Sequence, residues 1–523
     1  MKKLRLLLLA MAVVLGTASC KKDKNLANVE VHEHDKNLVS IDTVKFDGFF
    51  AKHPKFKEYE PEIRKLYRKH NHYIWHDKKG LIEFAEAIYN HAYQIEDEGL
   101  EGDLPYKEKL SYIFYGDESD KPDLESELLI SSMYFFYTKK VYEGLDTEKS
   151  RATGWYLPRE KVDYVAYLDT LMKDPTLIKQ DKKELFSQYY NLKKGLEKYR
   201  RIQKKGGWGT IKFDEGIKQL KKGDSSAVVS QVRKRLYTEG YLKDDSDKNI
   251  FDDELAEAVN NYEKTHNRES NSTISQQLID ELNVPVEERI KTISVNMERC
   301  RWVSPEINDA KEYIAVNIPS YKLRYVRDGE IVLNSKVVVG KVLNKTVVFS
   351  GDMSYLVFSP YWNVPKSILE NEIKPAIKKN PDYLAQHNME WNGNMVRQKP
   401  GGKNSLGLVK FMFPNSNNIY LHDTPAKSLF NKDDRAFSHG CVRVEKARDL
   451  AVAIAKKDGN WTESKVDAAM NAGREKVYRL KNKIPVYIVY FTAWADENGN
   501  VAFFDDIYKR DDRLATMLYK ILK

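Results

Sequence analysis

Two stretches decide how this chain folds and what it does: Arg435-Ala-Phe-Ser-His-Gly-Cys-Val-Arg-Val-Glu445 and, upstream, Ile419-Tyr-Leu-His-Asp-Thr424. The small residues of the first stretch predict a turn that presents Cys441. The second stretch is a short apolar strand that ends at His422, nineteen positions before the cysteine. A thiol must lose its proton before it attacks a carbonyl, so a cysteine near a histidine indicates a nucleophile with its base.

The sequence around these stretches predicts an antiparallel β-domain over 311–495. Apolar and polar residues alternate with a period of two, and short turns such as Arg327-Asp-Gly329 separate the runs. A helical, basic insertion is expected at 366–398, and a helix at 445–456 directly after the cysteine turn. The predicted strands are 313–319, 321–327, 330–339, 347–350, 355–358, 406–413 and 419–423.

The rest of the chain is mostly helical in pattern, which makes the whole protein a multidomain α+β chain. Residues 41–212 carry apolar side chains at helical spacing and predict a scaffold domain. Residues 213–285 predict a module of three helices, and 286–310 a connecting helix. Residues 496–523 are expected to pack back on the scaffold.

The cysteine turn and its surroundings resemble the L,D-transpeptidase catalytic domain (the YkuD fold). The family's pattern is a His followed by Ser/Thr-x-Gly-Cys-x-Arg, here His422 and Ser438-His-Gly-Cys-Val-Arg443. Longer phrases, Pro360-Tyr-Trp-Asn-Val-Pro365 among them, resemble the large, lidded subgroup with a scaffold and a peptidoglycan-binding module. Leu220-Lys-Lys-Gly-Asp224 resembles the start of that module, but Arg268–Thr273 departs from its usual glycine-containing motif. A purely structural three-helix module therefore stays open.

The resemblance implies a reaction on peptidoglycan stem peptides. Cys441 would attack the diaminopimelate–D-Ala bond, with His422 as proton acceptor and donor and the backbone N–H groups of Gly440 and Cys441 around the oxyanion. D-Ala would leave, and an acceptor stem amine would resolve the thioester to a 3→3 cross-link. Water as acceptor would give a carboxypeptidase, and a protein amine would give wall anchoring. Carbapenems are expected to acylate Cys441.

Six further residues are candidates for substrate binding or for support of the site. Arg443 could hold a substrate carboxylate or fix the loop. His439 is an alternative base, and Asp423 or nearby backbone could orient the His422 ring. Aromatic residues could line the groove or only pack. The set is Arg443, Tyr420, Trp362, Ser438, His439 and Asp423.

The N-terminus predicts export. A basic start is followed by an apolar run at 6–15, which is too short to span a bilayer, and by Thr17-Ala-Ser-Cys20. This resembles a lipoprotein signal (1–20) in which Cys20 carries lipid, followed by a flexible tether (21–40). An ordinary cleaved signal is the alternative. We expect a periplasmic lipoprotein, in the outer membrane, and no other segment is long and apolar enough for a transmembrane helix.

Composition narrows the function classes. The formal net charge is +9 with acids and bases mixed along the chain, which argues against a nucleic-acid-binding stripe. His70 and His72 lack further ligands at metal-site spacing, so no metal and no cofactor is expected. Cys300 is expected to be a small buried residue.

A non-catalytic wall-binding lipoprotein is a second hypothesis for the function. A thiol peptidase of the NlpC kind fits less well because its cysteine precedes its histidine. Other wall-synthesis enzymes are expected partners.

Overall fold

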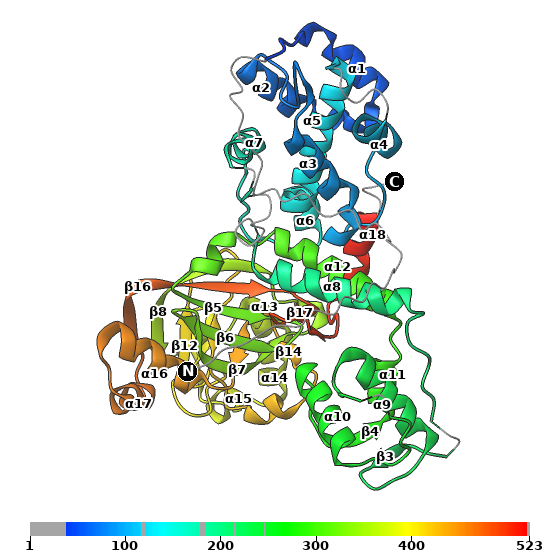
Figure 1. Cartoon of the computed structure of the whole chain (residues 1–523). Helices are drawn as coiled ribbons and strands as arrows, with labels where there is room; N and C mark the ends of the chain where they lie inside the picture. The colour runs from blue at the N-terminus through cyan, green and yellow to red at the C-terminus, as the bar shows by residue number, and fades with distance from the viewer. Residues whose placement is uncertain are drawn as a thin grey trace, which may run out of the picture.

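The computed structural model describes residues 38–116, 122–174, 176–177, 185–213, 216–244 and 246–519. The predicted signal with Cys20, and nearly all of the predicted tether, lie outside these residues. In Figure 1 most of the scaffold helices stand above two long helices, α8 (Gln188–Lys204) and α12 (Val286–Arg301). A β-domain and a small helical module lie below these two helices. In this described part of the chain, no helix is long and apolar enough to cross a membrane.

The scaffold is built around one buried helix, α5. Its residues are buried on nearly every side, which is typical of a helix in the centre of a bundle. Buried Glu127 of α5 accepts hydrogen bonds from the backbone of Ile74 and Trp75 and from the Tyr67 hydroxyl, and contacts His76. The scaffold helices are α1 (Phe46–Lys52), α2 (Glu60–His70), α3 (Glu83–Tyr93), α4 (Lys107–Tyr115), α5 (Leu124–Thr138), α6 (Thr147–Ala152), α7 (Tyr164–Lys173) and α8 (Gln188–Lys204). A short hairpin of β1 (His76–Asp77) and β2 (Gly80–Leu81) precedes α3.

The connecting helix α12 (Val286–Arg301) packs along α8 and joins scaffold to β-domain. Its buried Arg299 pairs with Asp511 of the last helix, α18 (Asp511–Tyr519), at 2.7 Å. One continuous apolar core runs from the scaffold helices through α12 into the β-domain. The scaffold and the β-domain are therefore one packed body, although the sequence suggests separate units.

The predicted three-helix module is present and has its own core. Serine and aspartate side chains cap its helices, which explains why each starts where it does. The module consists of β3 (Gln219–Lys221), α9 (Ala227–Glu239), α10 (Asp253–Thr265), β4 (Thr273–Ser275) and α11 (Gln276–Leu282), with β3 and β4 paired. Glu239 at the end of α9 accepts a hydrogen bond from Tyr199 of α8, which docks the module on the scaffold.

The β-domain is a closed sheet of nine strands. Its order is β14-β7-β15-β13-β12-β8-β16-β5-β6, and β7 also pairs with β6, which closes the barrel. The strands are β5 (Glu312–Asn317), β6 (Lys322–Arg327), β7 (Glu330–Gly340), β8 (Phe349–Phe358), β12 (Val409–Met412), β13 (Leu421–His422), β14 (Ala436–Ser438), β15 (Val442–Val444) and β16 (Lys476–Val489). Helices α16 (Ala447–Gly459) and α17 (Glu463–Met470) precede β16. The predicted fold class, a helical N-terminal region followed by a β-rich domain, is confirmed.

Two local expectations differ from the structure. The insertion at 366–398 is only partly helical, because a three-stranded sheet accompanies its short helices and gives it a separate apolar core. The expected boundary after 495 falls inside a hairpin of β17 (Ala493–Ala495) and β18 (Val501–Phe503). The insertion contains α13 (Lys366–Ile368), a π-helical turn η10 (Leu369–Ile373), α14 (Lys374–Lys379), α15 (Tyr383–Gln386), β10 (Met389–Asn392) and β11 (Met395–Gln398), with β9 (Trp362–Asn363) before it.

Candidate active site

Strand pairing brings the two halves of the site together. β13 and β15 are parallel neighbours, with Leu421 opposite Val442 and His422 opposite Arg443. The Val442 N–H donates to the Tyr420 carbonyl at 3.2 Å, so Tyr420 lies beside Cys441. Side chains alternate along a strand, and Leu421 and Val442 are fully buried in the barrel. His422 and Cys441 therefore share the opposite face.

The cysteine turn is held by hydrogen bonds of its own. The buried Ser438 hydroxyl donates to the Cys441 carbonyl at 2.5 Å and accepts from the Gly440 N–H at 3.1 Å. The Gly440 carbonyl accepts from the Thr346 hydroxyl at 2.9 Å. Gly440 has φ +117°, which side chains other than glycine rarely adopt. The predicted oxyanion donor Gly440 N–H is therefore engaged by Ser438 in this structure.

The His422 ring is oriented by backbone. Its Nδ1 lies 2.5 Å from the Asp423 carbonyl oxygen, which can only accept a hydrogen bond. Nδ1 therefore carries the proton, and Nε2 of the neutral ring has a free lone pair. Burial, together with the positive charge of Arg443, lowers the pKa of His422 to about 4. The resting imidazole is thus neutral and able to accept a proton at neutral pH.

The Cys441 thiol is also neutral at rest. Desolvation raises its pKa above the ordinary value, and this outweighs the opposing effects of Tyr420 and Arg443. Burial, together with the interaction of the Tyr420 hydroxyl with Cys441, raises the pKa of that hydroxyl. The Sγ atom also lies 3.8 Å from the Asn418 carbonyl oxygen. A pair with a neutral thiol and a neutral imidazole favours proton transfer during attack over a preformed ion pair.

Two cations flank the histidine. In the sheet, His422 lies directly opposite Lys410 of β12 on one side and Arg443 of β15 on the other. Desolvation lowers the pKa of both cations. The Nε of Arg443 is buried and has no hydrogen-bond partner among the residues that the structure describes. This side of the site is therefore electropositive and suited to a substrate carboxylate.

Asp423 supports the site through its side chain as well as its backbone. One carboxylate oxygen accepts from the Leu408 N–H at 2.9 Å, and the other pairs with Lys427 at 2.7 Å. Gly407 packs against this carboxylate so closely that a Cβ there would lie 2.3 Å from Asp423 Oδ2. The buried carboxylate therefore fixes the strand end that carries His422.

His439 faces the insertion. Its Nε2 lies 3.1 Å from a carboxylate oxygen of Glu372 in the π-helical turn η10. Trp362, for which groove lining and simple packing were both open, packs against the insertion's own apolar core. His439 therefore connects the cysteine turn to the insertion.

The structure brings most of the predicted site residues together in one place. Tyr420, His422, Cys441 and Arg443 share a face of two paired strands. Cys300 lies apart, fully buried in α12, as predicted. Lys410 was missed. Its signal was a lone charge inside the otherwise apolar strand Val409–Met412.

Comparisons with known proteins identify the domain that carries this site. Residues 311–477 match the family model of the L,D-transpeptidase catalytic domain, YkuD, and residues 61–196 match that of the scaffold domain. A Haemophilus influenzae protein, named provisionally as an L,D-transpeptidase, is 36% identical over 242 residues, which cover 42% of this chain and 48% of that protein. The chain thus spans about half the length of this curated relative.

Solved structures of similar proteins are more distant. An L,D-transpeptidase from Mycobacterium smegmatis is 13% identical with a TM-score of 0.20, over 34% of this chain and 59% of that one. One from Stackebrandtia nassauensis is 12% identical with a TM-score of 0.23, over 54% of this chain and 96% of that one.

Proposed function

Because this chain carries a YkuD-type L,D-transpeptidase catalytic domain joined to a scaffold domain, we propose that it cross-links peptidoglycan stem peptides through an acyl-enzyme on Cys441. The observation that carries the proposal is the pairing of β13 with β15. That pairing sets the thiol on the same strand face as a neutral imidazole with a free Nε2.

In the first step, the Cys441 sulfur attacks the carbonyl carbon of the diaminopimelate–D-Ala bond. His422 Nε2 takes the thiol proton as the C–S bond forms, and then gives it to the departing amine of D-Ala. The products are a thioester on Cys441 and free D-Ala. The orientation of the ring by the Asp423 carbonyl keeps Nε2, and not Nδ1, directed to this task.

In the second step, the side-chain amine of an acceptor stem attacks the thioester. His422 accepts a proton from that amine, the new amide forms, and the sulfur leaves and regains a proton. Arg443 and Lys410 are proposed to hold substrate carboxylates beside the reacting bond. The Gly440 N–H would have to leave the Ser438 hydroxyl to reach an oxyanion.

The test is turnover of purified disaccharide-tetrapeptide, followed by mass spectrometry. A dimer that lacks one D-Ala is the expected product. Tripeptide alone would assign a carboxypeptidase, and transfer only to protein amines would assign wall anchoring. No turnover, with wild-type protein indistinguishable from Cys441→Ala, would leave the non-catalytic wall-binding role. An adduct of a carbapenem on Cys441, found by intact mass, would support an accessible nucleophile.

We further propose that the protein is exported and anchored by lipid on Cys20, on the periplasmic side of the outer membrane. The support is the basic start, the apolar run and the small residues before the cysteine. Metabolic labelling with a fatty-acid probe, followed by membrane fractionation, tests this. Label that persists in Cys20→Ala would contradict it.

A further inference from the structure

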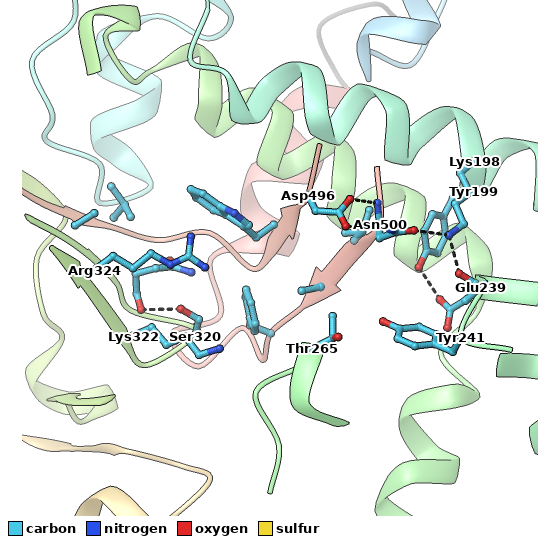
Figure 2. A pocket seen from close by; sticks show the side chains of 18 residues that line it. Lys198, Tyr199, Glu239, Tyr241, Thr265, Ser320, Lys322, Arg324, Asp496 and Asn500 are labelled. Carbon is cyan, nitrogen blue, oxygen red and sulfur yellow. Dashed lines mark hydrogen bonds between the residues drawn. The ribbon is translucent and has the colours of Figure 1, made fainter. Parts of the chain in front are cut away.

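A pocket of about 540 Å³ lies where three parts of the chain meet, apart from the cysteine turn. Its floor is the outer face of β5 and β6, and one wall is the β17–β18 hairpin. The other walls are α8 and the C-terminal ends of α9 and α10 (Figure 2). None of the residues assigned above to the catalytic site lines it.

The floor of the pocket carries two cations two residues apart, Lys322 and Arg324. Leu323 and Tyr325, which alternate with them in β6, are fully buried inside the barrel, so the cations face outward. Their cross-strand neighbours in β5 are Asn317 and Ala315. These side chains are short, and they leave open space next to the cations.

No charge in the described residues neutralises this cation pair. Neither side chain has an ion pair or a hydrogen bond there. Desolvation lowers the pKa of both, and for Lys322 the charge of Arg324 adds to the effect. Such partly desolvated cations gain most from an anion that enters from solution.

The acids that line the same pocket are already engaged. Glu239 pairs with Arg235 at 2.7 Å and accepts from the Tyr199 hydroxyl at 2.5 Å. Asp496 accepts the backbone N–H and the side-chain amide of Asn500, each at 2.9 Å. Figure 2 shows Glu239 at the end of the pocket opposite Lys322 and Arg324. The pocket therefore has a cationic end and a polar end.

The remaining lining adds an aromatic surface and neutral polar groups. The Trp494 ring centroid lies 5.6 Å from the Arg324 guanidinium carbon. Tyr241, Thr265 and Asn500 supply a second ring, a hydroxyl and an amide. An aromatic face with hydroxyl and amide groups suits a sugar or a short peptide, and the volume fits one small ligand.

We propose that this pocket binds one carboxylate-bearing unit of the wall polymer, with the carboxylate on Lys322 and Arg324 and the rest of the unit against Trp494. The carboxylate could belong to the sugar or to the stem peptide. The identity of the polymer rests on the proposed function. The pocket would hold the polymer at a point separate from the cysteine turn.

Isothermal titration calorimetry on the full chain carrying Cys441→Ala tests this without turnover. The probes are disaccharide-tetrapeptide, the disaccharide with a free sugar carboxylate, and the free tetrapeptide. Adding Lys322→Gln with Arg324→Gln removes the cations. Lys481→Gln with Lys483→Gln is the matched control, because these exposed lysines also lie two apart on one strand, β16.

We expect the pocket variant to bind one of the probes about 10- to 100-fold more weakly, because it has lost charge-assisted hydrogen bonds to the carboxylate. The control variant should bind that probe as tightly as Cys441→Ala alone. The probe affected assigns the carboxylate to sugar or stem. Ala315→Phe keeps both charges but fills the space, so it should weaken the same probe. Equal binding of every probe by all of these proteins would overturn the proposal.

The pocket and the reaction fail separately. Suppose that protein with an intact Cys441 shows no turnover, but that adding Lys322→Gln and Arg324→Gln to Cys441→Ala weakens the binding of a probe. Only the proposed reaction is then overturned. If turnover of disaccharide-tetrapeptide proceeds and the pocket variant changes no binding, only the pocket proposal is overturned.

Discussion

The protonation state of Cys441 at rest gives the sharpest test of the site. The pKa of His422 is about 4, and burial holds the pKa of the Cys441 thiol above its ordinary value. An ordinary thiol has a pKa of about 8.5, so moving the proton from sulfur to nitrogen costs at least about 6 kcal/mol. Even two opposite charges in contact, about 4 Å apart, would recover only about 4 kcal/mol at an effective dielectric constant of about 20. The ion pair therefore lies at least about 2 kcal/mol uphill, a population of about 3% or less.

The assay is the ultraviolet absorbance of the thiolate, followed from about pH 6 to about pH 10. The perturbation is His422→Ala, and Cys441→Ala gives the baseline. Cys300 stays silent in this range because burial raises its pKa. We expect no thiolate band at neutral pH in wild type, and a band that rises only at a higher pH than for an ordinary exposed thiol, because burial raises the pKa of Cys441. His422→Ala should leave the neutral-pH absorbance unchanged.

The opposite result is equally clear. A thiolate band near neutral pH in wild type that disappears in His422→Ala would mean a preformed ion pair. It would refute the argument that desolvation outweighs the attraction between the two groups, and with it the proton transfer proposed to accompany attack.

Three further predictions follow from the same geometry. The acid limb of the pH profile of kcat/KM should have its midpoint near pH 4, the pKa of His422. Lys410→Met should move this midpoint upward, because the substitution removes a positive charge next to His422. A midpoint near pH 6.5 in wild type would contradict the lowered pKa of His422. The pKa of His422 is lower in the folded state than in the unfolded state, so between about pH 6.5 and 4 only the unfolded chain binds a proton there. Up to about 3 kcal/mol of the free energy of unfolding is therefore lost as pH falls through that window. His422→Asn, followed by urea unfolding, should lack this part of the loss, and an equal loss in both proteins would exclude His422 as its source. Gly407→Ala should destabilise by about 2 kcal/mol or more, since its φ is +61° and its Cβ would meet Asp423; Gly329→Ala, with φ +82° in open space, should lower the melting temperature less, and equal losses would argue against the contact.

The contact of the insertion with the cysteine turn suits a cover that responds to substrate. Glu372 and His439 are both at the surface, and their contact links the cysteine turn to an insertion that has its own apolar core. Exposed pairs of this kind contribute about 1 kcal/mol or less, so the contact can open at little cost. A substrate that enters the site can therefore displace it.

The sequence alone determined the local chemistry and the kind of elements. A period of two in the apolar residues fixed the β-domain, and helical spacing fixed the scaffold, because each pattern matches one backbone geometry. The choice of Cys441 and His422 needed only residue types and order. Their neighbours along the chain, Gly440 and Arg443, were found in the same way.

Only the tertiary structure decided which residues face one another. Lys410 is a lone lysine in an apolar strand until pairing of β12 with β13 sets it opposite His422. His439 is next to Gly440 in sequence, yet it contacts Glu372 of the insertion. The neutral state of Cys441 and His422 depends on their burial in the folded protein. Spacing along a chain cannot report desolvation or cross-strand charge, because both come from segments distant in sequence.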